Sequence, residues 1–82
     1  MSIPLVFRSP PDIEEDVFGT YESFPTPVIT VRMGLPPAQR RLTVLHEVLH
    51  AIDDIYGLDL GERRVRVLEQ ALGTVLGHPV LQ

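Results

Sequence analysis

Two histidines and a glutamate lie close together in the stretch LHEVLHA, which spans residues 45–51. On an α-helix, residues four apart share one face and are offset by about 6 Å along the axis. The imidazoles of His46 and His50 can therefore reach one cation at the Zn–N distance of about 2.0–2.1 Å. Glu47 lies about 100° from His46 on the same helical wheel, beside the pair. A carboxylate in that place can take a proton from water activated by the metal, so the stretch predicts a zinc site with Glu47 as general base.

The histidines lie in a predicted helix. Nothing between about Ala38 and Tyr56 breaks a helix, and Pro36 or Pro37 can occupy its first turn. Gly57 then offers a stop where positive φ costs little. The polar residues of this helix form one wedge centred on the histidines, which consists of Thr43, His46, Glu47, His50, Asp53 and Asp54. Such a wedge disfavours a histidine pair in the core, but a plain solvated helix face would also produce it.

The remaining patterns predict the elements that position this helix. Three β-type runs precede it, at residues 3–7, 17–24 and 28–33, and the last of these is strongly β-branched. A second helix is expected from Gly61 or Glu62 to about Leu76, with one buried apolar stripe that begins at Val65. The predicted fold is α+β, with a small N-terminal sheet, an active-site helix and a second, antiparallel helix. Residues 1–82 are expected to form a single domain.

Composition excludes several classes of protein. The chain has no cysteine, so disulfides and thiolate ligands are excluded and any metal must be held by nitrogen and oxygen. A net charge of −4 argues against a nucleic-acid-binding surface, and the cluster Arg63, Arg64 and Arg66 is too small to reverse that. No stretch approaches the roughly 18 apolar residues of a membrane span, and no targeting segment is recognised. We expect a cytoplasmic protein without nucleic-acid or membrane partners.

The motif also carries a family resemblance. The stretch from Thr43 to Leu76, with HEVLHAI at residues 46–52, YGL at residues 56–58 and a short helix bearing glutamates, resembles small bacterial and phage zincin-like proteins. These are relatives of the ImmA/IrrE metallopeptidases and the compact minigluzincins. The β-type run Val28–Met33 fits the strand that such folds place before the active-site helix. The resemblance implies a zinc-dependent endopeptidase that acts on proteins or peptides in the cytoplasm, often in phage-related settings.

Catalytic zinc needs a third protein ligand, and two glutamates are candidates. Glu62 opens the second helix in a Glu-x-x-Val-x-x-Leu pattern similar to that of ImmA/IrrE relatives. Glu69 lies nineteen positions after His50, close to the spacing of gluzincin peptidases. The two are within about 20° on the helical wheel and about 10 Å apart along the axis, so only one can bind the same zinc. We favour Glu62 as the third ligand, with Glu69 as the alternative, and expect the other of the two to be a surface glutamate. The remoter alternatives are Asp53, Asp54, His78 or no third ligand.

A ligating histidine commonly donates its outer N–H to a carboxylate. Thermolysin-like enzymes carry an aspartate for this purpose four residues after the ligand glutamate, but Arg66 and Gly73 occupy those positions after Glu62 and Glu69. Asp53, on the side of the histidines, is the alternative candidate. Tyr21 and Tyr56 are the phenols available to stabilise an oxyanion.

The predicted activity is peptide hydrolysis by zinc-activated water, with the extended run Val28–Met33 pairing with substrate main chain as an added strand. Two alternatives stay open. The first is a zinc-holding regulatory or structural protein without turnover. The second is a small interaction module that binds no metal, for which chelation would leave folding unchanged.

Overall fold

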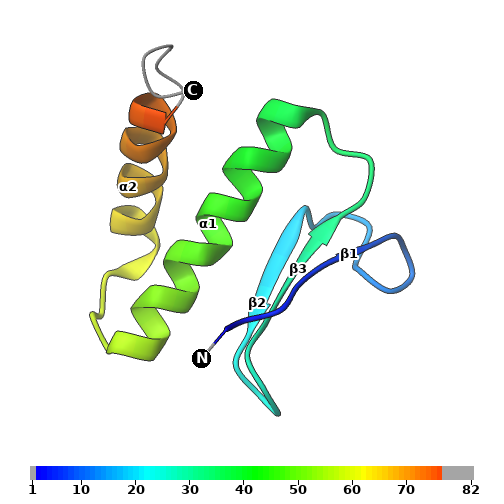
Figure 1. The fold of residues 1–82 in the computed structure, drawn as a ribbon, viewed down its shortest axis with the longest axis horizontal. Helices are drawn as coiled ribbons and strands as arrows, with labels where there is room; N and C mark the ends of the chain where they lie inside the picture. The colour runs from blue at the N-terminus through cyan, green and yellow to red at the C-terminus, as the bar shows by residue number, and fades with distance from the viewer. Residues whose placement is uncertain (1, 77–82) are drawn as a thin grey trace.

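The computed structural model describes residues 2–76, in which three strands are followed by two helices (Figure 1). The strands are β1 (Leu5–Arg8), β2 (Gly19–Glu22) and β3 (Val28–Arg32), and the helices are α1 (Pro37–Tyr56) and α2 (Gly61–Leu76). The predicted α+β class is confirmed. Of the two described helices, neither has the length and apolar character needed to cross a membrane.

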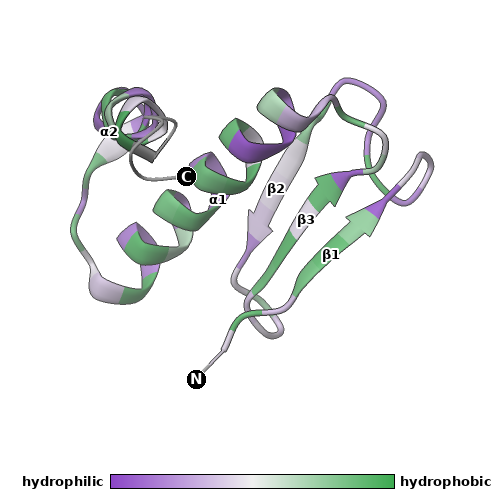
Figure 2. Ribbon diagram, turned by 45° about the horizontal axis from the view of Figure 1, so that its top comes forward, coloured by the Kyte–Doolittle hydropathy of each residue, from purple (hydrophilic) through white to green (hydrophobic). Residues whose placement is uncertain are grey.

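The sheet has the order β1-β3-β2, with β1 parallel and β2 antiparallel to β3. Ile29 of β3 pairs with Leu5 on one side and with Tyr21 on the other. The β-branched sequence of β3 suits a central strand, since side chains of this kind pack well on a pleated surface. Apolar residues are concentrated in β1 and β3, whereas β2 is more polar (Figure 2).

The central position of β3 corrects one prediction. Both edges of β3 are occupied by β1 and β2, so its backbone has no free hydrogen-bonding edge for a substrate. The expected pairing of Val28–Met33 with substrate main chain is therefore wrong. Strong β-propensity indicated the central strand of the sheet. A substrate peptide can pair only with a strand at the edge of the sheet.

Helix α1 lies between the sheet and α2 (Figure 1). The core between α1 and the sheet is centred on Ile29, Val31 and Ala51, which are at most 5% exposed. Burial of the Ile29 and Val31 side chains stabilises the fold by about 1.5–3 kcal/mol each. Helix α1 is thus held against the sheet on one face and presents another face to α2.

Helix α2 buries less of its apolar stripe than predicted. Val65 is fully buried, but Leu68 and Leu72 are each 36% exposed and Val75 is 53% exposed. In Figure 1, α2 lies beside α1 and away from the sheet, and most of its described side chains are exposed. Further along, α2 approaches α1 closely at Gly73, where an added Cβ would lie 3.2 Å from Leu42 Cδ2.

The loop between the helices is fixed by Asp53. Its backbone carbonyl accepts hydrogen bonds from the N–H groups of Gly57 and Leu58, and Gly57 has the positive φ (61°) predicted for a helix stop. The Asp53 carboxylate accepts a further hydrogen bond from the Leu60 N–H, at 2.9 Å. One residue therefore closes α1 and orders the chain just before α2, which fixes where α2 begins.

Arg32, on β3, braces the acidic loop between β1 and β2. Its guanidinium donates to the backbone carbonyls of Glu14 at 2.7 Å and Val17 at 3.1 Å, and also to that of Glu15. Ile13, in the same loop, is only 5% exposed. These contacts fix the path of the chain into β2.

Gly19 lets β2 lie close to α1. A Cβ at this position would be 2.6 Å from Thr43 Cγ2, 3.2 Å from Glu47 Cγ and 3.2 Å from the Thr30 carbonyl oxygen. The first distance is shorter than any ordinary carbon–carbon contact, so a side chain at position 19 would force β2 and α1 apart. Sequence patterns gave no sign of this requirement, because it arises from the approach of two distant segments.

Gly19→Ala should therefore destabilise the protein by about 1–3 kcal/mol, the usual cost of overpacking. Thr43→Ser removes Cγ2, the nearest clashing atom, and keeps the hydroxyl. In a double-mutant cycle followed by urea denaturation, Gly19→Ala should cost less in the Thr43→Ser background than in the wild type. Equal costs in the two backgrounds would contradict the proposed contact.

Candidate metal centre

His46 and His50 are adjacent on the face of α1 that meets α2. Their Nε2 atoms are 3.1 Å apart, and their rings stand edge to face with centroids 4.7 Å apart. The side chains are 23% and 29% exposed, so both are sheltered yet open to solvent. The i, i+4 spacing thus directs both nitrogens to one point, as the sequence predicted.

Glu62, in the first turn of α2, reaches the same point. Its Oε1 lies 3.0 Å from His46 Nε2 and its Oε2 lies 3.1 Å from His50 Nε2. One donor atom from each of His46, His50 and Glu62 falls within 4.8 Å of the others. Of the two glutamates weighed from sequence, Glu62 is the one whose carboxylate meets both histidines at Nε2.

These separations suit zinc. Tetrahedral ligands at about 2.0–2.1 Å from the metal lie roughly 3.3 Å from one another. The contacts of 3.0 to 3.1 Å among the two Nε2 atoms and the Glu62 carboxylate are close to that edge length. Imidazole nitrogen and carboxylate oxygen are also donors that zinc accepts, and three protein ligands leave a fourth position open.

Hydrogen bonding alone leaves part of the cluster unexplained. If Nδ1 of His46 donates to a carboxylate, its Nε2 carries a lone pair, and the oxygens of Glu62 also carry only lone pairs. Their approach is favourable only when a proton or a metal ion lies between them. Protons on both Nε2 atoms could each be donated to one oxygen of Glu62, but the two N–H groups would then lie side by side with their nitrogens 3.1 Å apart. A single metal cation would satisfy the two Nε2 atoms and the Glu62 carboxylate at once, because all three can act as ligand atoms.

Glu69 also lies against His46, on the other side of the ring. Its Oε2 is 2.8 Å from His46 Nδ1, and its side chain is only 15% exposed. The expectation that the second glutamate would be an exposed surface residue is therefore wrong. Glu62 and Glu69 are nearly two turns apart on α2, and their carboxylates contact the two different nitrogens of the His46 ring.

Glu47 lies beside the cluster, on the side of α1 that faces β2. It is 6% exposed, and Gly19 of β2 packs close to its side chain. Burial raises the pKa of Glu47, and the negative charges of Glu62 and Glu69 act in the same direction, whereas His46 and His50 lower it. A carboxyl of this kind is suited to accept and return a proton.

Two hollows meet at Glu47, and residues of β2 or the segment just before it line both. The hollow next to His46 is lined by Asp16, Phe18, Gly19, Gln39, Thr43, His46, Glu47, Arg66, Glu69 and Gln70. The hollow next to His50 is lined by Thr20, Tyr21, Ser23, Glu47, His50, Asp53 and Asp54. Glu47 therefore borders both hollows, together with residues in or next to β2.

The remaining candidates have other contacts. Asp53 caps the interhelical loop, and among residues 2–76 no hydrogen bond joins it to a histidine. Tyr21 lines the hollow beside His50, and its hydroxyl donates a hydrogen bond to Asp54 Oδ2 at 2.8 Å. This hydrogen bond raises the pKa of Tyr21. Tyr56 is 74% exposed and lines an apolar groove beside β1 instead. His78 lies outside the described residues.

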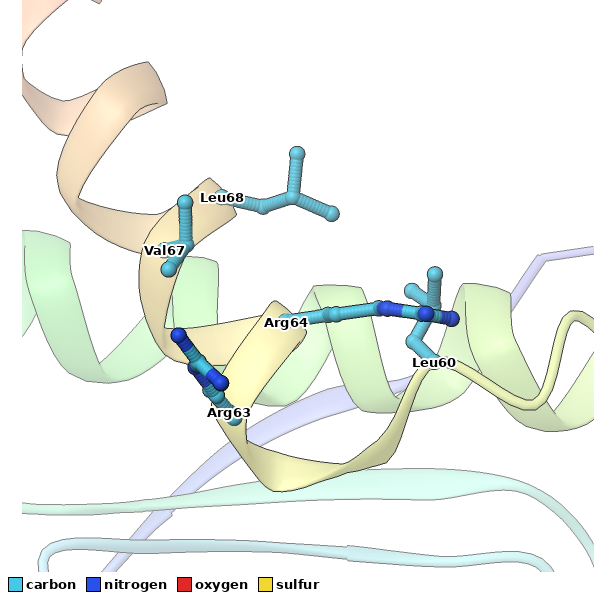
Figure 3. A pocket seen from close by; sticks show the side chains of 5 residues that line it. All are labelled: Leu60, Arg63, Arg64, Val67 and Leu68. Atoms are coloured by element: carbon cyan, nitrogen blue, oxygen red, sulfur yellow. The ribbon is translucent and has the colours of Figure 1, made fainter.

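The arginine cluster divides between two surfaces. Arg66 turns toward Glu62, at 3.6 Å, and lines the hollow beside His46. Arg63 and Arg64 instead line a groove with Val67 and Leu68 of α2 and with Leu60, which precedes the helix (Figure 3). Because the three side chains diverge, they form no continuous basic stripe of the kind that follows a phosphate backbone.

The buried Glu47 should affect the metal-free protein in a pH-dependent manner. A raised pKa means that the folded state favours the protonated carboxyl, so the ionised form lowers stability as pH rises through that pKa. With a chelator present, Glu47→Gln should therefore be more stable than the wild type at pH 7, and the difference should shrink toward pH 4. Thermal unfolding at the two pH values measures this. Glu22→Gln, which changes an exposed carboxylate on β2, should show no such difference. A stability gain in Glu47→Gln that does not depend on pH would contradict the raised pKa of Glu47.

Comparison with protein-family models, with curated proteins and with solved structures finds no match. The resemblance of residues 43–76 to zincin-like proteins thus stays a prediction, and the geometry of the donors is what bears on function.

Proposed function

We propose that the protein is a zinc-dependent peptidase, with a zincin-like arrangement of its helices. The observation that carries this proposal is the convergence of His46, His50 and Glu62 on one point beside the buried Glu47. Three ligands, an open fourth position and an adjacent general base are the parts that zinc-dependent hydrolysis of an amide requires.

In this proposal His46, His50 and Glu62 hold the zinc ion. When bound, zinc acts as a Lewis acid that lowers the pKa of water to about 7 and polarises a carbonyl group. Glu47 accepts the proton released from the attacking water. Because its pKa is raised by burial, the same carboxyl can pass that proton to the departing amine.

The substrate would lie along β2. This strand pairs with β3 on one edge, and its residues line both hollows beside Glu47. An extended peptide could use backbone groups of β2 in place of the β3 edge that the sheet already occupies. Such pairing depends on main-chain groups, so we expect loose sequence preference and best cleavage of unfolded chains.

A zinc-binding protein without turnover is the second candidate. The observation that favours it is the 6% exposure of Glu47, which leaves little of this carboxylate open to water. The two candidates share the metal site and differ only in what Glu47 does. Mutation of the ligands and mutation of Glu47 therefore test separate parts of the proposal.

The metal site predicts about one zinc ion per chain in protein purified without added metal. Glu62→Ala removes one of three protein ligands and should weaken zinc binding by at least about tenfold. Atomic absorption and chelator competition measure stoichiometry and affinity. Glu22→Gln is the matched control and should bind zinc as the wild type does. Failure of the wild type to take up zinc under any loading condition would favour an interaction module that binds no metal.

The catalytic role of Glu47 predicts that Glu47→Gln retains zinc but loses about 10²–10⁴-fold in turnover of a fluorescently labelled, unfolded protein. The amide keeps the size of the side chain but does not accept the proton. Unchanged turnover in this variant would contradict the mechanism. Zinc-loaded wild type that cleaves no unfolded substrate would instead support the second candidate.

A further inference from the structure

We propose that Glu69 is a positioning residue, which accepts the Nδ1–H of His46 and thereby holds His46 Nε2 toward the metal. The inference rests on the metal site of the proposed function, but it does not depend on peptide hydrolysis. It gives Glu69 a role distinct from both sequence-based expectations, third ligand or surface glutamate.

The contact itself is specific. Glu69 Oε2 lies 2.8 Å from His46 Nδ1, a normal length for a charge-assisted hydrogen bond, and the side chain is 15% exposed. An ionised carboxylate only accepts hydrogen bonds, so Nδ1 must carry the proton. Neutral His46 is then the tautomer whose lone pair is on Nε2, the atom that lies 3.0 Å from Glu62. Glu69 therefore selects the form of His46 that can bind a metal.

The two histidines are not held equally. His46 is bound on both sides, by Glu69 at Nδ1 and by Glu62 at Nε2. In the stretch 2–76, no hydrogen bond is found at Nδ1 of His50, whose contacts are made through Nε2. A fixed ring loses less rotational freedom on binding a metal, so Glu69 makes His46 the more preorganised ligand.

The placement of Glu69 follows from the helix that also supplies Glu62. Seven residues are nearly two helical turns, so Glu62 and Glu69 lie on one face of α2, about 10 Å apart along the helix axis. The His46 ring lies between them, with Nε2 toward Glu62 and Nδ1 toward Glu69. Glu62 can thus be a metal ligand while Glu69 accepts the hydrogen bond from His46 Nδ1, so the two roles do not compete.

The experiment compares zinc affinity in the wild type, Glu69→Gln, Glu69→Ala and Glu22→Gln by competition with a chromophoric chelator. Loss of an outer carboxylate of this kind typically weakens zinc binding by about 10–100-fold, so we expect this for Glu69→Ala with a stoichiometry still near one. Glu69→Gln keeps an oxygen acceptor and should fall between Glu69→Ala and the wild type. Glu22→Gln should match the wild type.

A second measurement separates positioning from mere packing. ¹⁵N NMR of the imidazole rings in the zinc-loaded wild type should show His46 protonated at Nδ1, with slow exchange of that proton with water. In Glu69→Gln, which keeps the shape of the side chain, the same proton should exchange faster. Packing alone would leave this exchange rate unchanged.

Three results would overturn the inference. Wild-type affinity in Glu69→Ala, with unchanged exchange at Nδ1 in Glu69→Gln, would overturn it while leaving the metal site intact. Loss of zinc stoichiometry in Glu69→Ala, together with its retention in Glu62→Ala, would make Glu69 a ligand. Absence of zinc from the wild type would overturn the metal site and this inference with it.

Discussion

The contact between the Glu62 carboxylate and the two imidazole nitrogens is the interaction that joins the two helices at the candidate metal centre. Lone pairs held 3.0 to 3.1 Å apart repel one another unless positive charge lies among them. Among its described side chains, helix α2 has Val65 as its one fully buried apolar residue, while Leu68 and Leu72 are each 36% exposed, so its apolar contact with α1 is limited. A metal that binds only the folded chain would add its binding free energy to the attachment of α2 to α1.

The rest of the fold serves to bring the donors together. Asp53 closes α1 and orders the loop by accepting a hydrogen bond from the Leu60 N–H. This loop sets the position along α1 at which Glu62 contacts the histidines. On the opposite side of α1, Gly19 permits β2 to approach Glu47 closely and bury it. His46 and His50 therefore face α2 and Glu47 faces β2, and α1 connects the proposed metal ligands to the proposed general base.

Local sequence patterns were sufficient to predict both helices and the wedge of polar residues. The spacing of His46 and His50 fixes their common face, and Gly57 marks the helix end because positive φ costs glycine little. The three strands were predicted with shifted bounds, and α+β was the correct class. In each case the deciding physics is contained within a few consecutive residues.

Contacts between distant segments were harder to predict. A helical wheel gives the direction in which Glu62 and Glu69 project from α2. It does not say which residues of α1 lie opposite each of them, so the sequence could not tell the two apart. Which residues lie opposite depends on the loop around Asp53 and on the packing at Gly73. The wrong assignment of β3 as a substrate strand has a similar origin, because β-propensity does not say which strand lies at the edge of a sheet. The role of Gly19 left no local pattern.

The most direct test of the central claim is an anomalous difference map, recorded at the zinc absorption edge from crystals of the zinc-loaded protein. The account predicts a single strong peak about 2.0–2.1 Å from Nε2 of both His46 and His50, with the Glu62 carboxylate as the third protein ligand. A peak elsewhere, or no peak near these nitrogens, would contradict it.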